Sequence, residues 1–583
     1  MYMSCTWQVF HRLAHALALA AFLMGFSVML SFPAVGFASV ASGDADYALQ
    51  VNDPTTANQY AVGDDNAAFE PNGAFTFSAW LKPTDCSSVR TYWRKEISYA
   101  FSCQAGTWQY AIHDDLNGWR GWVNSGVTAH TNQWSHIAWV RSGADAPVRL
   151  FVNGQLAFTD GTSVGPLTNS ANAMYVGVDF TGDPVPYFEG SIDELRIYNT
   201  DRSNVSGQNL VPTDMHTYGP IDTSGLLAYF DFNEGPAGTA GTGTVYNRVP
   251  EATSATHLRT VGSPTYTDVK QTTSNGNDTV VTFPRSYLNA AGGWRVPQWI
   301  TSAQALVVAG GAGGGYDSGG GGGGGGVSAE DSLSLTPNAI APVVIGAGGR
   351  GGFGHCAGGG TDSRQGCTGN DGQSSTFAAT TVTGGGGGGG VEVDGRDAGT
   401  SDDSELRGGG GGGGGQLANG LLTGVISGGA GWNSGGDVAS DHTNNLAGGG
   451  GGAGGVGNPG GSISRQGQGG AGVNSAISGS TLMYGSGGGG GSYNPLLVSA
   501  DAVSGAGRGG YGAVHAGNAA ANRGGGGGGG ADSTKKGGDG GSGVVIVSYG
   551  SSCSPTESQY TDGATTYKVL TFTDTGSCTW TVP

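Results

Sequence analysis

Apolar and polar residues alternate along several short segments in the first half of the chain. In residues 75–82, Phe75, Phe77 and Leu81 fall on one side of an extended chain, and Trp80 falls on the other. This period of two predicts a strand with one buried face. Similar runs with turn signals between them lie at 134–141, 148–152, 155–158, 173–177, 190–198 and 225–232. Many short strands without a helical period predict an antiparallel sandwich over residues 44–250.

A two-residue turn joins two of the predicted strands. Asn153 and Gly154 separate the apolar runs 148–152 and 155–158. Both central positions of such a turn need a positive φ angle, which Asn and Gly adopt more readily than other residues. The pair therefore predicts a β-hairpin.

The second half of the chain has a different pattern, in which glycine runs lie within a frame of apolar segments. Strand-like segments lie at 279–283, 305–309, 342–345 and 544–549. The glycine runs are 319–326, 384–390, 408–415, 448–452, 487–491 and 524–530. A flexible linker is one interpretation of such sequence. However, a linker needs no apolar strands at both ends.

Ordered glycine runs must be held together by their main chains, because they have no side chains to bury. Fixing each residue costs about 1–2 kcal/mol of backbone entropy, and each hydrogen bond contributes about 1 kcal/mol. An extended helix with three residues per turn points its N–H and C=O groups outward, so neighbouring copies can bond to one another. We therefore expect residues 276–550 to form a β-framed bundle of polyglycine-II helices.

Residues 1–41 have the pattern of a secretory signal peptide. Arg12 precedes an apolar stretch from Leu13 to Phe32, and small residues follow up to Ala41. An uncleaved membrane anchor is the alternative, because about twenty apolar residues can span a bilayer. Both interpretations predict that the rest of the chain is secreted or displayed at the cell surface.

Six of the seven cysteines lie beyond this segment and form three local couples. Such couples are expected of disulfide bonds in an oxidising compartment. Spacing alone does not fix the connectivity, since six cysteines allow 15 pairings. The predicted bridges join Cys86 with Cys103, Cys356 with Cys367, and Cys553 with Cys578.

The composition makes one class of partner improbable. The 583 residues include 118 glycines, and the formal net charge is −19 at pH 7, with only 25 lysines and arginines. So few cations do not provide the basic stripe that binding to a phosphate backbone requires. A nucleic-acid partner is therefore not expected.

Several tryptophans lie near the middle of the predicted sandwich. Trp108, Trp119 and Trp122 stand beside glycines in segments typical of hairpin ends, with Asp114 and Asn117 among them. Exposed rings can stack on a sugar while polar neighbours bond to its hydroxyl groups. These five residues are the candidate ligand-binding residues. Packing within the core is the other interpretation of the rings.

Four motifs of the first half resemble the laminin-G-like, concanavalin-A-like jelly-roll family, which includes the pentraxins. The motifs are FTFSAWLKP at 75–83, WSHIAWVR at 134–141, LFVNG at 150–154 and FEGSIDELRIYN at 188–199. The resemblance implies a jelly-roll sandwich. It also implies a sugar-binding or adhesive role or, as in a few members, a glycosidase.

The likeness to pentraxins also implies calcium as a cofactor. The loop that follows Met174–Gly177 would supply Asp179 and Asp183, whose oxygen ligands suit calcium. A second acidic cluster should fall near residues 91–98, where Glu96 is the one acid. Solvated loop carboxylates are the alternative interpretation.

A catalytic role is not predicted. Glycosidases of this fold place three acids at alternate positions of one strand, so that two carboxylates flank the scissile bond. Here Asp193 and Glu194 are adjacent, so they point to opposite faces of a strand. The triple spacing is absent.

The second half resembles the glycine-rich domain of bacterial surface proteins. The matching segments are GWRVP at 293–297, ITSAQALVVAGGAGGG at 300–315 and GGSGVVIVSY at 540–549. Similar bundles occur in phage tail-tip adhesins and in some receptor ectodomains. Residues 251–275 would link the two domains, and 551–583, which repeat the opening of the second, would begin a further repeat.

Together these patterns predict a non-enzymatic adhesion protein that binds a glycan or a cell-surface protein. Its glycine-rich domain would be a rigid display module. A structural filament or extracellular matrix component is the alternative, and a glycoside hydrolase is a second. The sequence leaves the oligomeric state open.

Overall fold

The computed structural model describes most of the chain from residue 45 onward. The predicted signal segment lies outside the described residues. These are 45–51, 59–179, 187–219, 222–239, 243–250, 252–276, 278–298, 300–353, 367–391, 393–398, 409–414, 431, 433–438, 446–460, 467–493, 503–550, 556–562 and 565–571.

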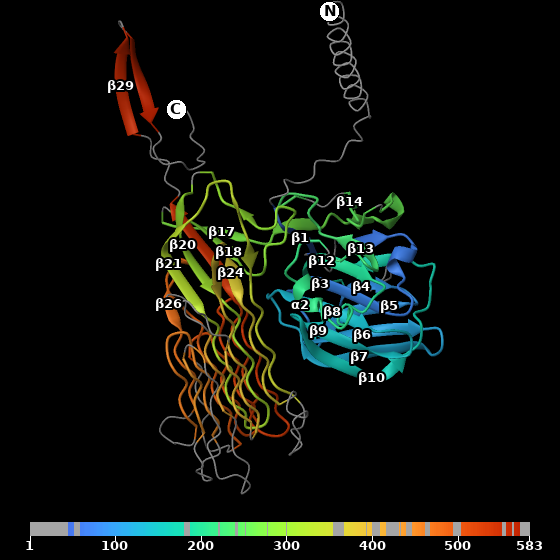
Figure 1. The fold of residues 1–583 in the computed structure, drawn as a ribbon. Helices are drawn as coiled ribbons and strands as arrows, with labels where there is room; N and C mark the ends of the chain where they lie inside the picture. The colour runs from blue at the N-terminus through green and yellow to red at the C-terminus, as the bar shows by residue number, and fades with distance from the viewer. Residues whose placement is uncertain are drawn as a thin grey trace, which may run out of the picture. The chain divides into compact units, whose positions relative to one another are not determined.

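Two eight-stranded antiparallel sheets form a sandwich in the first half of the chain (Figure 1). Sheet I consists of β1 (Tyr47–Val51), β3 (Phe75–Pro83), β8 (Ser135–Arg141), β9 (Ala146–Val152), β10 (Gln155–Val164), β12 (Gly190–Tyr198), β13 (Leu226–Phe230) and β16 (Thr265–Asp268). Its order is β10-β9-β8-β3-β12-β1-β16, and β13 pairs with β12.

Sheet II has the order β14-β15-β2-β11-β4-β5-β6-β7. Its strands are β2 (Tyr60–Gly63), β4 (Arg90–Lys95), β5 (Tyr99–Gln104), β6 (Thr107–Asp114), β7 (Gly118–Thr128), β11 (Met174–Val176), β14 (Thr244–Val245) and β15 (Leu258–Val261). The short helices of this half are η1 (Ala67–Phe69), α2 (Val211–Asp214) and η2 (Ser254–Thr256). The predicted jelly-roll sandwich is confirmed as an almost wholly β fold.

Strand β3 shows how the alternating sequence builds the core. Phe75, Phe77 and Leu81 are fully buried between the two sheets, whereas Trp80 is buried on the opposite face of sheet I. The predicted hairpin also forms, since β9 and β10 pair directly across Asn153 and Gly154, with φ angles of 52° and 77°. Only a residue that tolerates positive φ fits this turn without strain.

Aromatic rings fill much of the sandwich interior. The fully buried Trp139 lies 4.9 Å from the ring centre of Phe75, 5.5 Å from that of Phe77 and 5.5 Å from that of Tyr110. Burying a large apolar side chain contributes about 1.5–3 kcal/mol. The first half is therefore stabilised by contacts between side chains from both sheets.

Part of the segment expected to be a linker belongs to the sandwich. Strand β15 pairs with β2 in sheet II, and β16 pairs with β1 in sheet I. The two sheets therefore continue to Asp268, and the next strand, β17 (Gln271–Asn275), already belongs to the second half.

A five-stranded antiparallel sheet frames the glycine-rich half, in the order β17-β18-β28-β20-β21. The other strands of this sheet are β18 (Asp278–Phe283), β20 (Ser302–Val308), β21 (Val327–Ser334) and β28 (Val544–Gly550). Strand β28 pairs with both β18 and β20, so the last strand of the frame lies between two of its earlier strands. Small sheets add β19 (Trp294–Arg295), β22 (Ile340–Ala341), β23 (Val343–Val344), β24 (Ser375–Phe377), β25 (Thr380–Val382), β26 (Val473–Ser475) and β27 (Leu482–Tyr484).

The glycine runs bond to their neighbours with a period of three. Every third residue from Gly319 to Gly325 donates its N–H to the segment 524–530, with N···O distances of 2.8–3.1 Å. The residues between them donate in turn to 383–389 and 448–451. Residues three apart therefore face the same neighbour, which is the periodicity of an extended helix with three residues per turn.

Run 319–326 is surrounded by six such segments. Besides the three that receive its N–H groups, three others donate to its carbonyl oxygens, namely 309–315, 410–413 and 488–491. All of its residues are buried. Each main chain is thus satisfied by other main chains rather than by its own turn, as the adjacent extended runs in Figure 1 illustrate.

This packing leaves no space for side chains. A Cβ atom at Gly323 would lie 1.8 Å from the carbonyl oxygen of Gly410, and one at Gly320 would lie 1.9 Å from that of Gly413. Such approaches are far below any van der Waals contact, and the clashing atoms are main-chain atoms that cannot rotate away. Glycine is therefore required here by close approach, not by an unusual φ angle.

Side chains of the sandwich dock on the edge of the glycine-rich half. Gln155 accepts a hydrogen bond from the Arg350 main-chain N–H at 3.0 Å and donates to the carbonyl of Asp371 at 2.9 Å. Gln373 donates to the carbonyl of Asn153 at 3.1 Å. The Gln155 side chain therefore satisfies two main-chain groups at the edge of the bundle, and the turn carbonyl of Asn153 binds a side chain of the bundle.

A second contact ties the end of β7 to the same half. Lys536 donates to the carbonyl of Gly126 at 3.0 Å, and His130 lies 3.2 Å from the carboxylate of Asp539. The Asp539 carboxylate also accepts from the main-chain N–H of Gly351 at 2.9 Å. Strand β7 is thus linked to the bundle by side chains of both halves.

The C-terminal region contains a separate two-stranded hairpin. Strands β29 (Thr556–Asp562) and β30 (Thr565–Thr571) pair with Asp562 opposite Thr565. The hairpin β17–β18 closes in the same way, with Asn275 opposite Asp278. The expectation that residues 551–583 begin a further repeat stays a prediction.

Candidate functional site

The two sheets of the sandwich differ in what covers their outer faces. On sheet I, Trp80 and Trp134 flank the guanidinium of Arg285 from the glycine-rich half, at 5.5 and 4.9 Å from the ring centres. Arg285 also forms ion pairs with the buried carboxylates of Asp46 and Asp193. This part of sheet I is therefore occupied by the second half of the chain and is closed to a ligand.

The acids considered for hydrolysis lie in this closed region. Asp193 and Glu194 are fully buried, and burial raises the pKa of both carboxyls, that of Glu194 to about 7. Glu194 pairs with Arg196 at 2.5 Å and accepts from the Tyr229 hydroxyl. Neither carboxyl can reach a polysaccharide chain.

The outer face of sheet II contains a row of residues paired across five strands. Between the larger residues the row has two alanines, which are buried at 0% and 4% exposure. The row runs through Tyr175, Arg94, Ala100, Ala111 and Trp122 on β11, β4, β5, β6 and β7.

Two tryptophans of β7 stand partly exposed at the end of this face. Trp119 is 39% exposed and Trp122 is 37% exposed. Trp119 contacts the His113 ring edge-on, with ring centres 5.3 Å apart, and the Arg94 guanidinium lies 5.4 Å from its ring centre. Trp122 pairs with Ala111 on the adjacent strand β6.

Arg94 holds two carboxylates beside these rings. Its Nε donates to Glu96 at 2.7 Å, and its guanidinium also forms an ion pair with Asp179. Burial raises the pKa of the Asp179 carboxyl, and the neighbouring Arg94 opposes that rise. The cluster combines one fixed cation with two acceptor groups at the edge of an aromatic surface.

The structure separates the five predicted ligand-binding residues. Trp119 and Trp122 lie on the exposed strand, and Asn117 is exposed in the turn before it. Trp108 is fully buried, with its ring 5.5 Å from that of Tyr92, so it belongs to the core and cannot stack on a ligand.

Asp114 has a structural role in the turn between β6 and β7. Its carboxylate accepts from the main-chain N–H groups of Leu116 and Asn117 and from the Asn117 side chain, at 2.7–3.2 Å. Burial would raise the pKa of this carboxyl, but the hydrogen bonds from Asn117 and its neighbours bring the pKa below its ordinary value. Asp114 thus fixes the turn that positions Trp119.

The described residues do not fit a calcium ion. Calcium needs several free carboxylate or carbonyl oxygens, and the Asp179 carboxylate is already bound by Arg94. Asp183 lies outside the described residues. Within those residues, no group of three or more His, Cys, Asp and Glu side chains could hold a metal ion.

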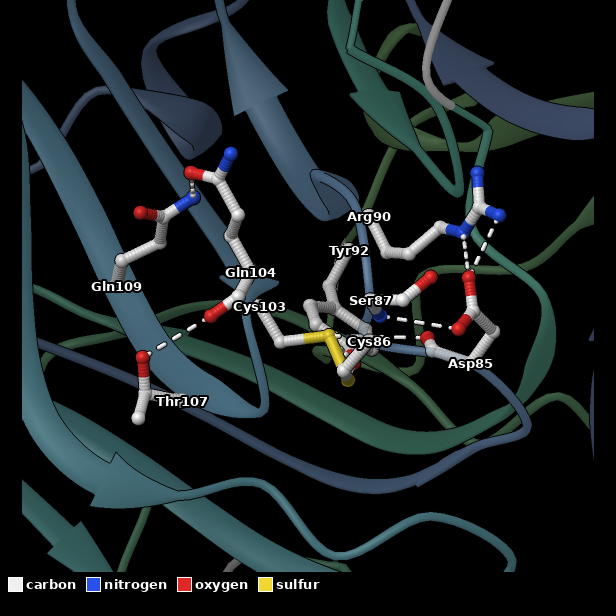
Figure 2. The surroundings of a disulfide bond; sticks show 9 residues. All are labelled: Asp85, Cys86, Ser87, Arg90, Tyr92, Cys103, Gln104, Thr107 and Gln109. Atoms are coloured by element: carbon white, nitrogen blue, oxygen red, sulfur yellow. Dashed lines mark hydrogen bonds and ion pairs between the residues drawn. A yellow bond between two sulfur atoms is a disulfide. The ribbon is translucent and has the colours of Figure 1, made fainter.

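One of the predicted disulfides lies on the core side of sheet II. Cys86 and Cys103 are bonded, and the Tyr92 hydroxyl lies 3.1 Å from the Cys103 sulfur (Figure 2). In the same view Arg90 pairs with Asp85 at 2.7 Å. The disulfide bond therefore holds the start of β4 against the end of β5. It also confirms the first predicted cysteine pair.

The other two couples fall partly or wholly outside the described residues. Cys367 is fully buried and disulfide-bonded, while its expected partner Cys356 is not among the described residues. Cys553 and Cys578 also lie outside them. Their connectivity stays a prediction.

Arg94 is the candidate site residue that the sequence pattern did not reveal. Strand β4 contains a bulge between Thr91 and Trp93, so Tyr92 and Trp93 both face the core. Strict alternation from Tyr92 would place Arg94 inside the sandwich. A charged residue directly after two aromatic ones was the only available signal of a change of face.

Two family models match the chain. Residues 54–204 match a model described as the concanavalin A-like lectin/glucanases superfamily, and residues 289–550 match one described as a glycine-rich domain. The chain carries a concanavalin A-like domain and a glycine-rich domain. The exposed tryptophans and the Arg94 cluster both belong to the concanavalin A-like domain. No curated protein matches the chain.

Several solved structures match part of the chain at low sequence identity. A candidate carbohydrate binding protein from Bacteroides ovatus has 15% identity and a TM-score of 0.31, and the match covers 39% of this chain and 60% of that one. A pentraxin from Limulus polyphemus has 13% identity and a TM-score of 0.22, over 30% of this chain and 82% of the other. Domain 4 of an extracellular arabinanase from Geobacillus stearothermophilus has 23% identity and a TM-score of 0.21, over 26% and 71%.

Each of these matches covers only part of this chain and part of the solved one. The chain spans less than two thirds of the length of the Bacteroides protein. In the described part of the chain, no helix is both long and apolar enough to cross a membrane.

Proposed function

We propose that the concanavalin A-like domain binds carbohydrate on the outer face of strands β4–β7. The observation that carries this proposal is the position of Trp119 and Trp122, which are both partly exposed beside the Arg94 cluster. A sugar needs an aromatic surface for its apolar face and fixed polar groups for its hydroxyls. This face offers both within one sheet.

The polar groups of the face are held in place before any ligand arrives. Glu96 keeps about a third of its side chain exposed while Arg94 fixes its carboxylate. His113 bonds to the Thr168 hydroxyl at 2.8 Å, which fixes the ring next to Trp119. Such preorganisation favours binding because fewer side chains must be ordered with the ligand.

Binding rather than hydrolysis suits this geometry. Glu96 and Asp179 share one guanidinium and therefore both act as hydrogen-bond acceptors, whereas a glycosidase needs one carboxyl to act as a general acid. The remaining candidate acids, Asp193 and Glu194, are buried. We therefore propose a non-enzymatic role.

The same proposal places the protein outside the cytoplasm as an adhesion or display protein. The Cys86–Cys103 bond suits an oxidising compartment, and the pattern of residues 1–41 suits export. The docked glycine-rich domain would hold the sugar-binding face as a stiff support. The proposed partners are glycans of a cell surface or matrix.

A glycan array probed with the full chain tests the binding role. Trp122→Ala should weaken binding about tenfold, because a stacked ring contributes about 1.5 kcal/mol beyond its area. Tyr493→Ala is the matched control, since Tyr493 is 60% exposed in the glycine-rich half. Loss of binding in both variants, or unchanged binding in Trp122→Ala, would contradict the proposed site. The absence of any bound glycan would contradict the proposed role.

A further inference from the structure

Two consecutive basic residues of β4 each hold a pair of carboxylates. Arg94 pairs with Glu96 and Asp179 on the outer face of sheet II. Lys95 points the other way and pairs with Asp65 and Glu70. Every acidic pair next to this strand, among the described residues, therefore already contains a cation supplied by the chain.

The guanidinium of Arg94 occupies the space between its two carboxylates. Its Nε lies 2.7 Å from Glu96 Oε2, and its Nη1 donates to Asp179. The Arg94 side chain is only 12% exposed, and that of Asp179 10%. A calcium ion bound to the same oxygens would stand next to a permanent positive charge in a poorly solvated place, where like charges repel strongly.

Lys95 fills the second acidic cluster in the same manner. Its ammonium group lies 2.7 Å from Asp65 Oδ1 and 3.1 Å from Glu70 Oε1, and it also donates to the carbonyl of Asn172. A lysine ammonium has three N–H donors, so all three are used. Its side chain is completely buried, so its charge is held between these acceptors.

We propose that Arg94 takes the place of a divalent cation between Glu96 and Asp179, so that the outer face of sheet II works without calcium. The guanidinium neutralises and orients the carboxylates, which is what a bound calcium ion would otherwise do. The part of this proposal that concerns ligand binding rests on the proposed function. The part that concerns the metal does not.

Calcium titration of the full chain tests the metal part without any glycan. At about 10 mM calcium chloride, roughly tenfold above the weakest Kd of extracellular calcium modules, the Tm of the unmodified protein should not differ from its value in a chelator. Arg94→Gln frees both carboxylates, so its Tm should rise by about 2 °C with calcium. Calorimetric titration with calcium alone should show heat of binding for this variant only.

Two further variants keep the test decisive. Arg94→Lys retains a cation and should respond like the unmodified protein, which also shows that the position tolerates substitution. Arg120→Gln is the matched control, because Arg120 on β7 pairs with the single acid Asp160 on β10 at 3.1 Å, and this variant should gain no response.

Two results would overturn the proposal. One is stabilisation of the unmodified protein by calcium. The other is a folded Arg94→Gln variant that does not respond to the ion. On the glycan array, chelator should leave binding of the unmodified protein unchanged, and loss of binding with chelator would also overturn it. An array without any bound glycan would refute the proposed function and leave the calcium result standing.

Discussion

The concanavalin A-like domain and the glycine-rich domain both exclude water from their interiors, but with different atoms. In the first, rings such as Trp139, Phe77 and Trp93 meet between two sheets. In the second, run 319–326 is buried by the peptide groups of six neighbouring segments. The sandwich interior consists of side chains, whereas the glycine bundle consists almost entirely of main chain and lies beside a framing sheet with apolar cores of its own.

This difference determines what each half can tolerate. A side-chain core absorbs a smaller residue at the cost of a cavity, because neighbouring rings can relax. A main-chain interior cannot absorb an added methyl group, since the atoms in contact are carbonyl oxygens held by hydrogen bonds on both sides. The glycine bundle should therefore lose more stability when a side chain is enlarged, and the sandwich core should lose more stability when a side chain is removed.

The largest effect is expected from a single methyl group in the bundle. Gly323→Ala would place a Cβ atom 1.8 Å from the Gly410 carbonyl oxygen, so the glycine-rich domain should lose more than about 4–5 kcal/mol of unfolding free energy. Calorimetry and hydrogen exchange of the bundle amides measure this loss. Gly550→Ala is the control, because no atom lies within 4 Å of its added Cβ. Equal stability of the two variants would disprove the close packing.

The next effect concerns a deletion from the sandwich core. Trp139→Ala removes a fully buried ring and should cost about 3–5 kcal/mol. Urea unfolding, followed by near-ultraviolet circular dichroism, measures the loss. Hydrogen exchange of the bundle should change less than in Gly323→Ala. A bundle that opens first in this variant would show that the two interiors are not independent.

A smaller, pH-dependent effect is expected where the halves meet. Burial raises the pKa of Asp46 to about 6, so the folded chain holds this proton more tightly than the unfolded chain. The contribution of Asp46 to stability is therefore fully present below about pH 4 and is lost as the pH rises through 6. Asp46→Asn stays neutral, and its stability relative to the unmodified protein should rise by up to about 2 kcal/mol between pH 4 and 7.

Comparing these two proteins at each pH measures Asp46 together with Asp193 and Glu194, because the Asp46 charge raises the pKa of both of these carboxyls. Arg285 and Asp268 also act on the Asp46 carboxyl and are present in both proteins. Burial lowers the pKa of His216 to about 4, so His216 acts in the opposite direction in both proteins and cancels in the difference. A stability difference that does not change with pH would refute the assignment. Asp331→Asn, at an exposed position, is the control.

The smallest effect on stability is expected at the proposed binding face. Trp122→Ala removes a ring that is 37% exposed, so the unfolding free energy should change by no more than about 0.5 kcal/mol. The same urea experiment measures it. A larger loss would mean that the ring supports the sheet, and the weakened glycan binding of this variant would then have a structural cause.

Sheet I could be predicted from the sequence far better than sheet II. Strands β3, β8, β9 and β12 pack one face on the core and follow the pattern of alternating residues or a strong turn signal. Strand β4 breaks the alternation, because its bulge places Tyr92 and Trp93 both on the core side. Strand β7 is mostly exposed, and its pairing with β6 is interrupted by bulges.

For the candidate site, the sequence indicated the exposed rings but not their neighbours. Glycines on both sides of Trp119 and Trp122 marked a hairpin, and the structure places both rings at its surface. Trp108 has a similar local sequence, yet its strand lies one position further into the sheet and its ring faces the core. The bulge that turns Arg94 outward depends on pairing with β5, which no local pattern reveals.

The contact between Lys536 and the Gly126 carbonyl has a mechanical consequence. Gly126 belongs to β7, the strand that carries both exposed tryptophans, and His130 with Asp539 reinforces the junction a few residues further along. A force on a ligand bound at those rings would be transmitted directly to the glycine-rich half rather than through a flexible linker. Because each glycine run is bonded to several neighbours, the load would be shared among many peptide groups at once.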